Sequence, residues 1–105
     1  MTKYYNKLVR DRIPEIIARA GGACATEILS EEDYLFYLDA KLSEELEEYR
    51  QSKSPEELAD LLEVIYAAAA ARGCTQEELE RIREEKKGKR GGFEDRILLL
   101  RVDEP

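Results

Sequence analysis

Residues 44–60 read EELEEYRQSKSPEELAD and contain the clearest structural signal in the chain. Ser54 is followed at once by Pro55 and, three residues after the serine, by Glu57, which is typical of the first turn of a helix. We predict helices over residues 31–51 and 55–72. The connection between them is only a few residues long, and such a short connection makes the two helices antiparallel neighbours.

Each of these helices has an apolar face that also contains carboxylates. In the first helix the face follows steps of three and four residues through Leu35, Leu38, Leu42, Glu45 and Tyr49, with Glu48 on its flank. In the second helix it consists of Glu57, Asp60, Val64, Ala67 and Ala71. In an antiparallel hairpin, residues equally distant from the turn lie level with one another. Glu48 is then level with Glu57, and Glu45 is level with Asp60.

Four carboxylates that converge in one layer predict a site for a divalent cation. Without compensation, such anions repel one another and their pKa values shift upward. Oxygen ligands without His or Cys suit Mg²⁺ or Mn²⁺ better than Ca²⁺. The alternative is a solvated acidic face, which is what a single EExxE motif usually is. The second acidic pair, in register across the turn, favours the metal site.

Two further helices are expected on either side of this hairpin, over residues 12–20 and 76–87. Ser30 and Thr75 each stand three residues before an acidic residue, as N-caps do, and so does Ser54. Gly73 and Gly88 are candidate helix ends.

Residues 24–29 and 96–102 have the composition of short strands and are expected to pair as a small antiparallel ribbon. A leucine-rich run is also compatible with a helix. The expected fold is mainly α, in a single domain over residues 1–105.

The composition excludes several classes of site. The 105 residues contain no histidine, so Ser-His-Asp sites, Cys-His sites and His-ligated metal centres are excluded. Cys24 and Cys74 lack metal-site spacing, and we expect free thiols in a reducing compartment, with one disulfide as the alternative. No signal-peptide core and no apolar run near ~20 residues is present. We therefore expect a cytoplasmic protein with no membrane partner.

The formal net charge of −7 is concentrated in the predicted hairpin. Residues 44–63 carry eight acidic and two basic groups, which accounts for −6 of the total. A pI near 4.8 argues against a nucleic-acid polymer as partner, because such binding requires a basic face. The acidity is better explained by a cation site than by a general property of the surface.

A cationic segment follows in the last predicted helix. Lys86 continues the face of Leu79 and Ile82 toward the expected core, and Arg90 precedes a Gly-Gly-Phe sequence that permits close backbone approach to a ligand. These cations are candidates for binding phosphate. The alternative is a solvated helix end whose cations interact with the helix dipole.

Three motifs together resemble the all-α nucleotide pyrophosphohydrolase superfamily and, within it, a small single-domain MazG-like branch. They are EExxE with ExxD over residues 44–48 and 57–60, YNKLVRDRIP over 5–14, and KKGKRGGF over 86–93. The resemblance extends over nearly the whole chain. It departs from typical MazG domains in one respect, since only eight residues separate Glu48 from Glu57. That difference affects the pocket rim and the assignment of a substrate.

The resemblance implies an antiparallel helical bundle that hydrolyses a nucleoside triphosphate to the monophosphate and pyrophosphate, removing non-standard or surplus nucleotides. It assigns Mg²⁺, with Mn²⁺ as a substitute, to Glu45, Glu48, Glu57 and Asp60. Either Glu44 or Glu48 would accept the proton of the attacking water.

Lys86 and Arg90 would stabilise charge on the substrate phosphates. Lys7 and Arg10 are further candidates for binding phosphate, with salt bridges of the N-terminal segment as the alternative. Superfamily members assemble as homodimers or homotetramers, and the same assembly is expected here.

Two other functions remain open at this level. One is the phosphoribosyl-ATP pyrophosphohydrolase step of histidine synthesis, which requires a pocket for a second ribose phosphate. The other is a non-catalytic helical oligomer that binds a nucleotide or a metal. The N-terminal motif favours the stand-alone MazG-like group.

Overall fold

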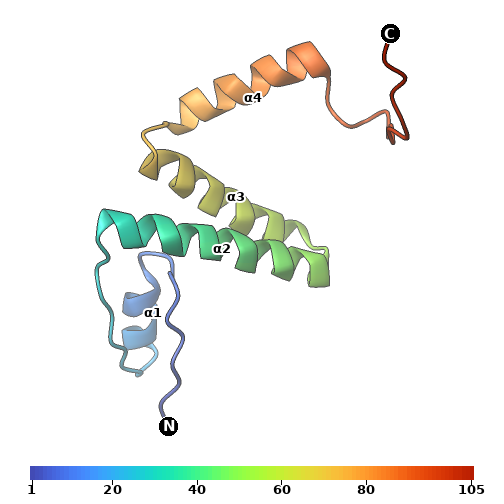
Figure 1. Ribbon diagram of the computed structural model, residues 1–105. Helices are drawn as coiled ribbons and strands as arrows, with labels where there is room; N and C mark the ends of the chain where they lie inside the picture. Colours follow the sequence, from blue (N-terminus) through green and yellow to red (C-terminus); the bar gives the residue numbers. More distant parts are fainter.

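The computed structural model describes all 105 residues, and its only regular elements are helices (Figure 1). They are α1 (Ile13–Arg19), α2 (Glu31–Ser52), α3 (Pro55–Ala71) and α4 (Gln76–Arg90). The four predicted helices and the mainly α fold class are therefore confirmed. None of these helices combines the length and the apolar content needed to cross a bilayer.

The antiparallel hairpin of α2 and α3 is the main packing contact of the chain (Figure 1). Lys53 ends α2 in a left-handed conformation, with φ 59°, and Pro55 begins α3. The predicted face of α2 points inward: Leu38 is 4% exposed and Glu45 is 6% exposed, and no other residue is buried. The centre of the molecule therefore contains a carboxylate.

Two of the three predicted N-caps form. The hydroxyl of Ser30 accepts a hydrogen bond from the amide of Asp33 at 3.2 Å, and that of Thr75 accepts one from the amide of Glu78 at 3.1 Å. The side chain of Ser54 makes no such bond. The start of α3 is therefore set by its proline and by the tight turn rather than by a side-chain cap.

The two predicted helix ends behave differently. Gly73 follows α3 with φ 83°, a left-handed conformation that favours glycine. Gly88 does not end α4, which continues to Arg90 and ends before Gly91 with φ 81°. One glycine inside a helix costs about 1 kcal/mol relative to alanine, which the favourable interaction of three basic residues with the helix dipole in the last turn can offset.

The expected β ribbon is absent. Residues 24–29 and 96–102 form no strand, and they lie at opposite ends of the molecule, one beside α1 and the other beyond α4 (Figure 1). Their apolar side chains stay exposed, with Ile28 95% and Leu98 81% accessible. The helices between the two segments hold them apart, so composition alone could not bring them together within one chain.

The outer helices do not close into a bundle around the hairpin. α4 contacts only α3, near the turn that joins them, and then diverges from it (Figure 1). The radius of gyration is 18.5 Å, whereas a compact domain of about 100 residues has about 13 Å. The chain is therefore an elongated molecule, 64 Å in its longest dimension, with a small core at the hairpin.

Candidate metal centre

The hairpin gathers the predicted carboxylates into one cluster. Ligand oxygens of Glu45 on α2 and of Glu57 and Asp60 on α3 all lie within 4.8 Å of one another. In a second group, ligand oxygens of Glu44, Glu45 and Glu48, all on α2, also lie within 4.8 Å of one another. Glu45 belongs to both groups. The predicted neighbourhood of Glu45 and Asp60 across the turn is present, whereas Glu48 falls in the group on α2, which does not include Glu57.

Two oxygens of this cluster lack a partner. Oε2 of Glu45 and Oε2 of Glu57 are buried and make no hydrogen bond. Burial, and after it the nearby charge of Glu48, raises the pKa of Glu45. Buried carboxylate oxygens without a donor or a cation are energetically costly. These atoms therefore fit a small cation that prefers oxygen, such as Mg²⁺.

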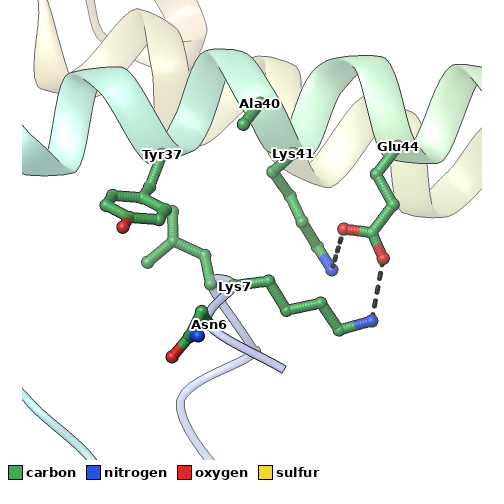
Figure 2. A pocket seen from close by; sticks show the side chains of 7 residues that line it. Asn6, Lys7, Tyr37, Ala40, Lys41 and Glu44 are labelled. Atoms are coloured by element: carbon green, nitrogen blue, oxygen red, sulfur yellow. Dashed lines mark hydrogen bonds and ion pairs between the residues drawn. The ribbon is translucent and has the colours of Figure 1, made fainter. Parts of the chain in front are cut away.

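Lys41 supplies a positive charge that the sequence analysis did not single out. It lies on α2 one turn before the acidic group. Its Nζ is 3.3 Å from Oε2 of Glu44 (Figure 2) and 3.4 Å from Oε1 of Glu45. Its side chain is only 16% exposed. Its contacts could have been predicted from the spacing, because Lys41 precedes Glu44 by three residues and Glu45 by four, and residues at such spacings are neighbours on the surface of a helix.

The N-terminal segment forms one wall of the site. Lys7 donates a hydrogen bond from Nζ to Oε1 of Glu44 at 2.9 Å, so Glu44 is held between two ammonium groups (Figure 2). This hydrogen bond raises the pKa of Lys7. Partial burial by itself would raise the pKa of Glu44, but its bond from Lys7 and the charge of Lys41 lower it overall.

Arg10 makes the second contact of this segment. Its Nη2 lies 2.7 Å from Oδ1 of Asp60, a predicted metal ligand on α3. Two roles were predicted for Lys7 and Arg10, either phosphate binding or salt bridges of the N-terminal segment. The structure contains the salt bridges. Both cations nevertheless stand at the edge of the carboxylate cluster.

An open cavity of about 440 Å³ is lined by residues of the N-terminal segment and of the hairpin. Its charged lining includes Arg10, Lys41, Glu45, Asp60 and Glu63. Small-molecule sites commonly measure about 300–1,000 Å³, so this cavity is large enough for a nucleotide. A space lined by both signs of charge suits a ligand that brings phosphate and cation together.

The cations of α4 lie outside this cluster. Lys86 and Arg90 are exposed, and neither forms an ion pair or a hydrogen bond with any of the carboxylates. The expected packing of Lys86 toward the core does not occur, because α4 diverges from the hairpin (Figure 1). Within one chain, only the N-terminal segment and α2 bring positive charge to the site.

The comparisons with known proteins do not identify a family. No protein-family model matches the chain, and no solved structure matches it. A protein of Mycolicibacterium smegmatis described as uncharacterized is 50% identical over 44 residues, which are 42% of this chain and 45% of that protein. The chain thus spans less than half the length of this relative.

Proposed function

We propose that the protein is a cytoplasmic, Mg²⁺-dependent nucleoside triphosphate pyrophosphohydrolase of the MazG-like type. The observation that carries the proposal is the pair of buried, unpartnered oxygens on Glu45 and Glu57, contributed by two helices next to a cavity of nucleotide size. A site for a phosphate-bound divalent cation explains why these anions are placed in the centre of the molecule. The sequence resemblance supports the same reaction class.

The residues that would hold Mg²⁺ are Glu45, Glu48, Glu57 and Asp60. When bound, the ion supplies positive charge that neutralises the substrate phosphates. Glu45 anchors the group because it is the most buried of the four and is shared by both acidic clusters.

Glu48 is the preferred proton acceptor. In the reaction, a water oxygen bonds to the α-phosphorus, the bond from that phosphorus to the α,β-bridging oxygen breaks, and pyrophosphate leaves. The proton of the water passes to a carboxylate. Glu44 is occupied by Lys7 and Lys41, and its lowered pKa makes it the weaker base. Glu48 is exposed and forms no ion pair.

Phosphate binding combines cations from two sources. Arg10 lines the cavity, and Lys7 contacts Glu44 at the edge of the carboxylate cluster. Both cations could turn from their carboxylate partners to the substrate if a metal ion took their place. Lys86 and Arg90 would come from a second copy of the chain, since α4 diverges from its own hairpin. A homodimer or homotetramer in which the outer helices complete an antiparallel bundle satisfies this requirement.

The test is pyrophosphate release from a panel of standard and non-standard nucleoside triphosphates and phosphoribosyl-ATP, in excess Mg²⁺. We expect release from at least one triphosphate and a loss of about 10²-fold or more in Glu48→Gln. The matched control is Glu47→Gln, which removes the neighbouring exposed carboxylate outside the acidic cluster. Activity of the control should be unchanged.

Other outcomes would identify the alternatives. Release from phosphoribosyl-ATP alone would assign the histidine-synthesis reaction. Nucleotide binding without release from any substrate would contradict the enzyme and favour a binding module. Equal losses in the two variants would show that general acidity, not the position of Glu48, matters.

A further inference from the structure

The C-terminal tail, defined as residues 96–102, carries apolar side chains that the rest of the chain does not cover. The exposed fractions of Ile97, Leu98, Leu99, Leu100 and Val102 lie between 62% and 86%. A contiguous apolar surface of this kind marks a site of interaction with another molecule. Composition of this sort is also typical of a strand.

The backbone of the tail is as unpartnered as its side chains. Residues 97–105 make no backbone hydrogen bond, and neither do residues 23–29 in the connection between α1 and α2. Backbone amides and carbonyls that will be buried require partners, and strand pairing is the usual source. The chain therefore contains two short segments, each with an unused set of donors and acceptors.

These two segments cannot meet within one molecule of this shape. Residues 24–29 lie beside α1, whereas the tail lies beyond the far end of α4 (Figure 1). The hairpin and α4 lie between the two segments (Figure 1), in a molecule that is 64 Å in its longest dimension. Each copy thus contains one segment of each kind, and the backbone groups of neither segment find a partner within their own chain.

We propose that the tail of one copy pairs as an antiparallel strand with residues 24–29 of a second copy, and that the exchange is reciprocal. Two such ribbons close a two-fold symmetric dimer and leave no unpaired segment. Alignment of the first residue of one segment with the last residue of the other places Cys24 beside Val102 of the other copy. Glu27 then lies diagonal to Arg101 on the same face of the ribbon, so the charges at the pairing are complementary.

The proposed exchange also explains the sparse core. Only Leu38 is a buried apolar residue in the isolated chain, and small domains need a larger buried surface to be stable. The inference specifies the contact in the homo-oligomer of the proposed function, but it is independent of the chemistry. A dimer without pyrophosphohydrolase activity would leave it intact.

The first test is sedimentation equilibrium of the full chain. The protein should be a dimer of the 12.1 kDa chain, and Leu98→Asp with Leu100→Asp should raise the dissociation constant by about tenfold or more. A monomer at all concentrations of the unmodified protein would overturn the proposal. Circular dichroism of the double variant checks that its helices persist.

The second test reads the pairing directly and does not depend on that variant. In a Cys74→Ser background, Cys24 is the one native thiol, and it is exposed. Val102→Cys, oxidised with glutathione disulfide, should give a covalent dimer on a non-reducing gel, whereas Ile97→Cys at the other end of the tail should give little. A disulfide within one chain, or a preference for Ile97→Cys, would contradict the reciprocal antiparallel pairing.

Discussion

Arg10 and Asp60 lie 50 residues apart in the sequence and are joined by an ion pair with 2.7 Å between Nη2 and Oδ1. This pair ties the N-terminal segment to α3 at one of the proposed metal ligands. A metal ion on this carboxylate would be repelled by the guanidinium, because both cations draw on the same negative charge. The N-terminal segment and the cation therefore compete for Asp60.

The competition predicts that Arg10→Gln tightens Mg²⁺ binding in the absence of nucleotide. Removal of an exposed ion pair is worth about 0.2–1 kcal/mol, so we expect a gain of up to about fivefold in affinity. Calorimetric titration with Mg²⁺ measures it. The control is Arg50→Gln, which removes the same charge but a contact to Glu47 outside the cluster. An equal gain in both variants would attribute the effect to net charge alone.

Glu45→Gln should separate the cost of the buried anion from its role as a ligand. In metal-free protein the variant should be more stable by about 1 kcal/mol or more, because a neutral amide replaces a carboxylate with an unpartnered oxygen. It should also lose the increase in melting temperature that Mg²⁺ gives the unmodified protein. Thermal unfolding with and without Mg²⁺ measures both effects. A variant that is destabilised without metal would show that the ion pair of Glu45 with Lys41 outweighs the cost of its unpartnered oxygen.

The hairpin and its acidic layer could be predicted from sequence because both depend on local rules. Helical periodicity and a short connection determine which residues face each other across the turn. Glu45 and Asp60 are aligned by those rules alone, and the structure places them in one cluster. The same reasoning located the inward face on which Leu38 is buried.

Contacts between distant segments could not be predicted in this way. Nothing in the local pattern around Lys7 indicates that it pairs with Glu44, because that contact depends on how the N-terminal segment crosses α2. Lys86 was predicted to face the core, but it is exposed. The direction of α4 depends on tertiary packing and not on the periodicity of the sequence of α4. Both cases concern placement of an element, which local sequence does not encode.

Lys41→Met should destabilise the metal-free protein by about 1–3 kcal/mol. The side chain is largely buried and is the only cation that contacts Glu45, so its removal leaves a buried charge without compensation. Saturating Mg²⁺ should restore part of the loss, since the ion supplies the missing positive charge. The control is Lys87→Met on the exposed end of α4. Chemical denaturation with and without Mg²⁺ measures the changes, and a loss that Mg²⁺ leaves unaltered would indicate a packing role for the lysine stem.

The pH dependence of stability should have opposite signs for the two adjacent glutamates. The folded-state pKa of Glu45 is raised above 4.5, so its penalty is complete above that raised pKa and disappears as the pH falls to 4.5. The excess stability of Glu45→Gln over the unmodified metal-free protein should therefore shrink between neutral pH and about 4.5.

The folded-state pKa of Glu44 is lowered, so its stabilisation is present above 4.5 and is lost only as the pH falls through that lower pKa. Glu44→Gln should accordingly be less stable than the unmodified protein at neutral pH, with a difference that closes only below about 4.5. Urea denaturation across this pH range, in the presence of a chelator, tests both signs, and parallel curves for the two variants would contradict the distinct environments of the two carboxylates.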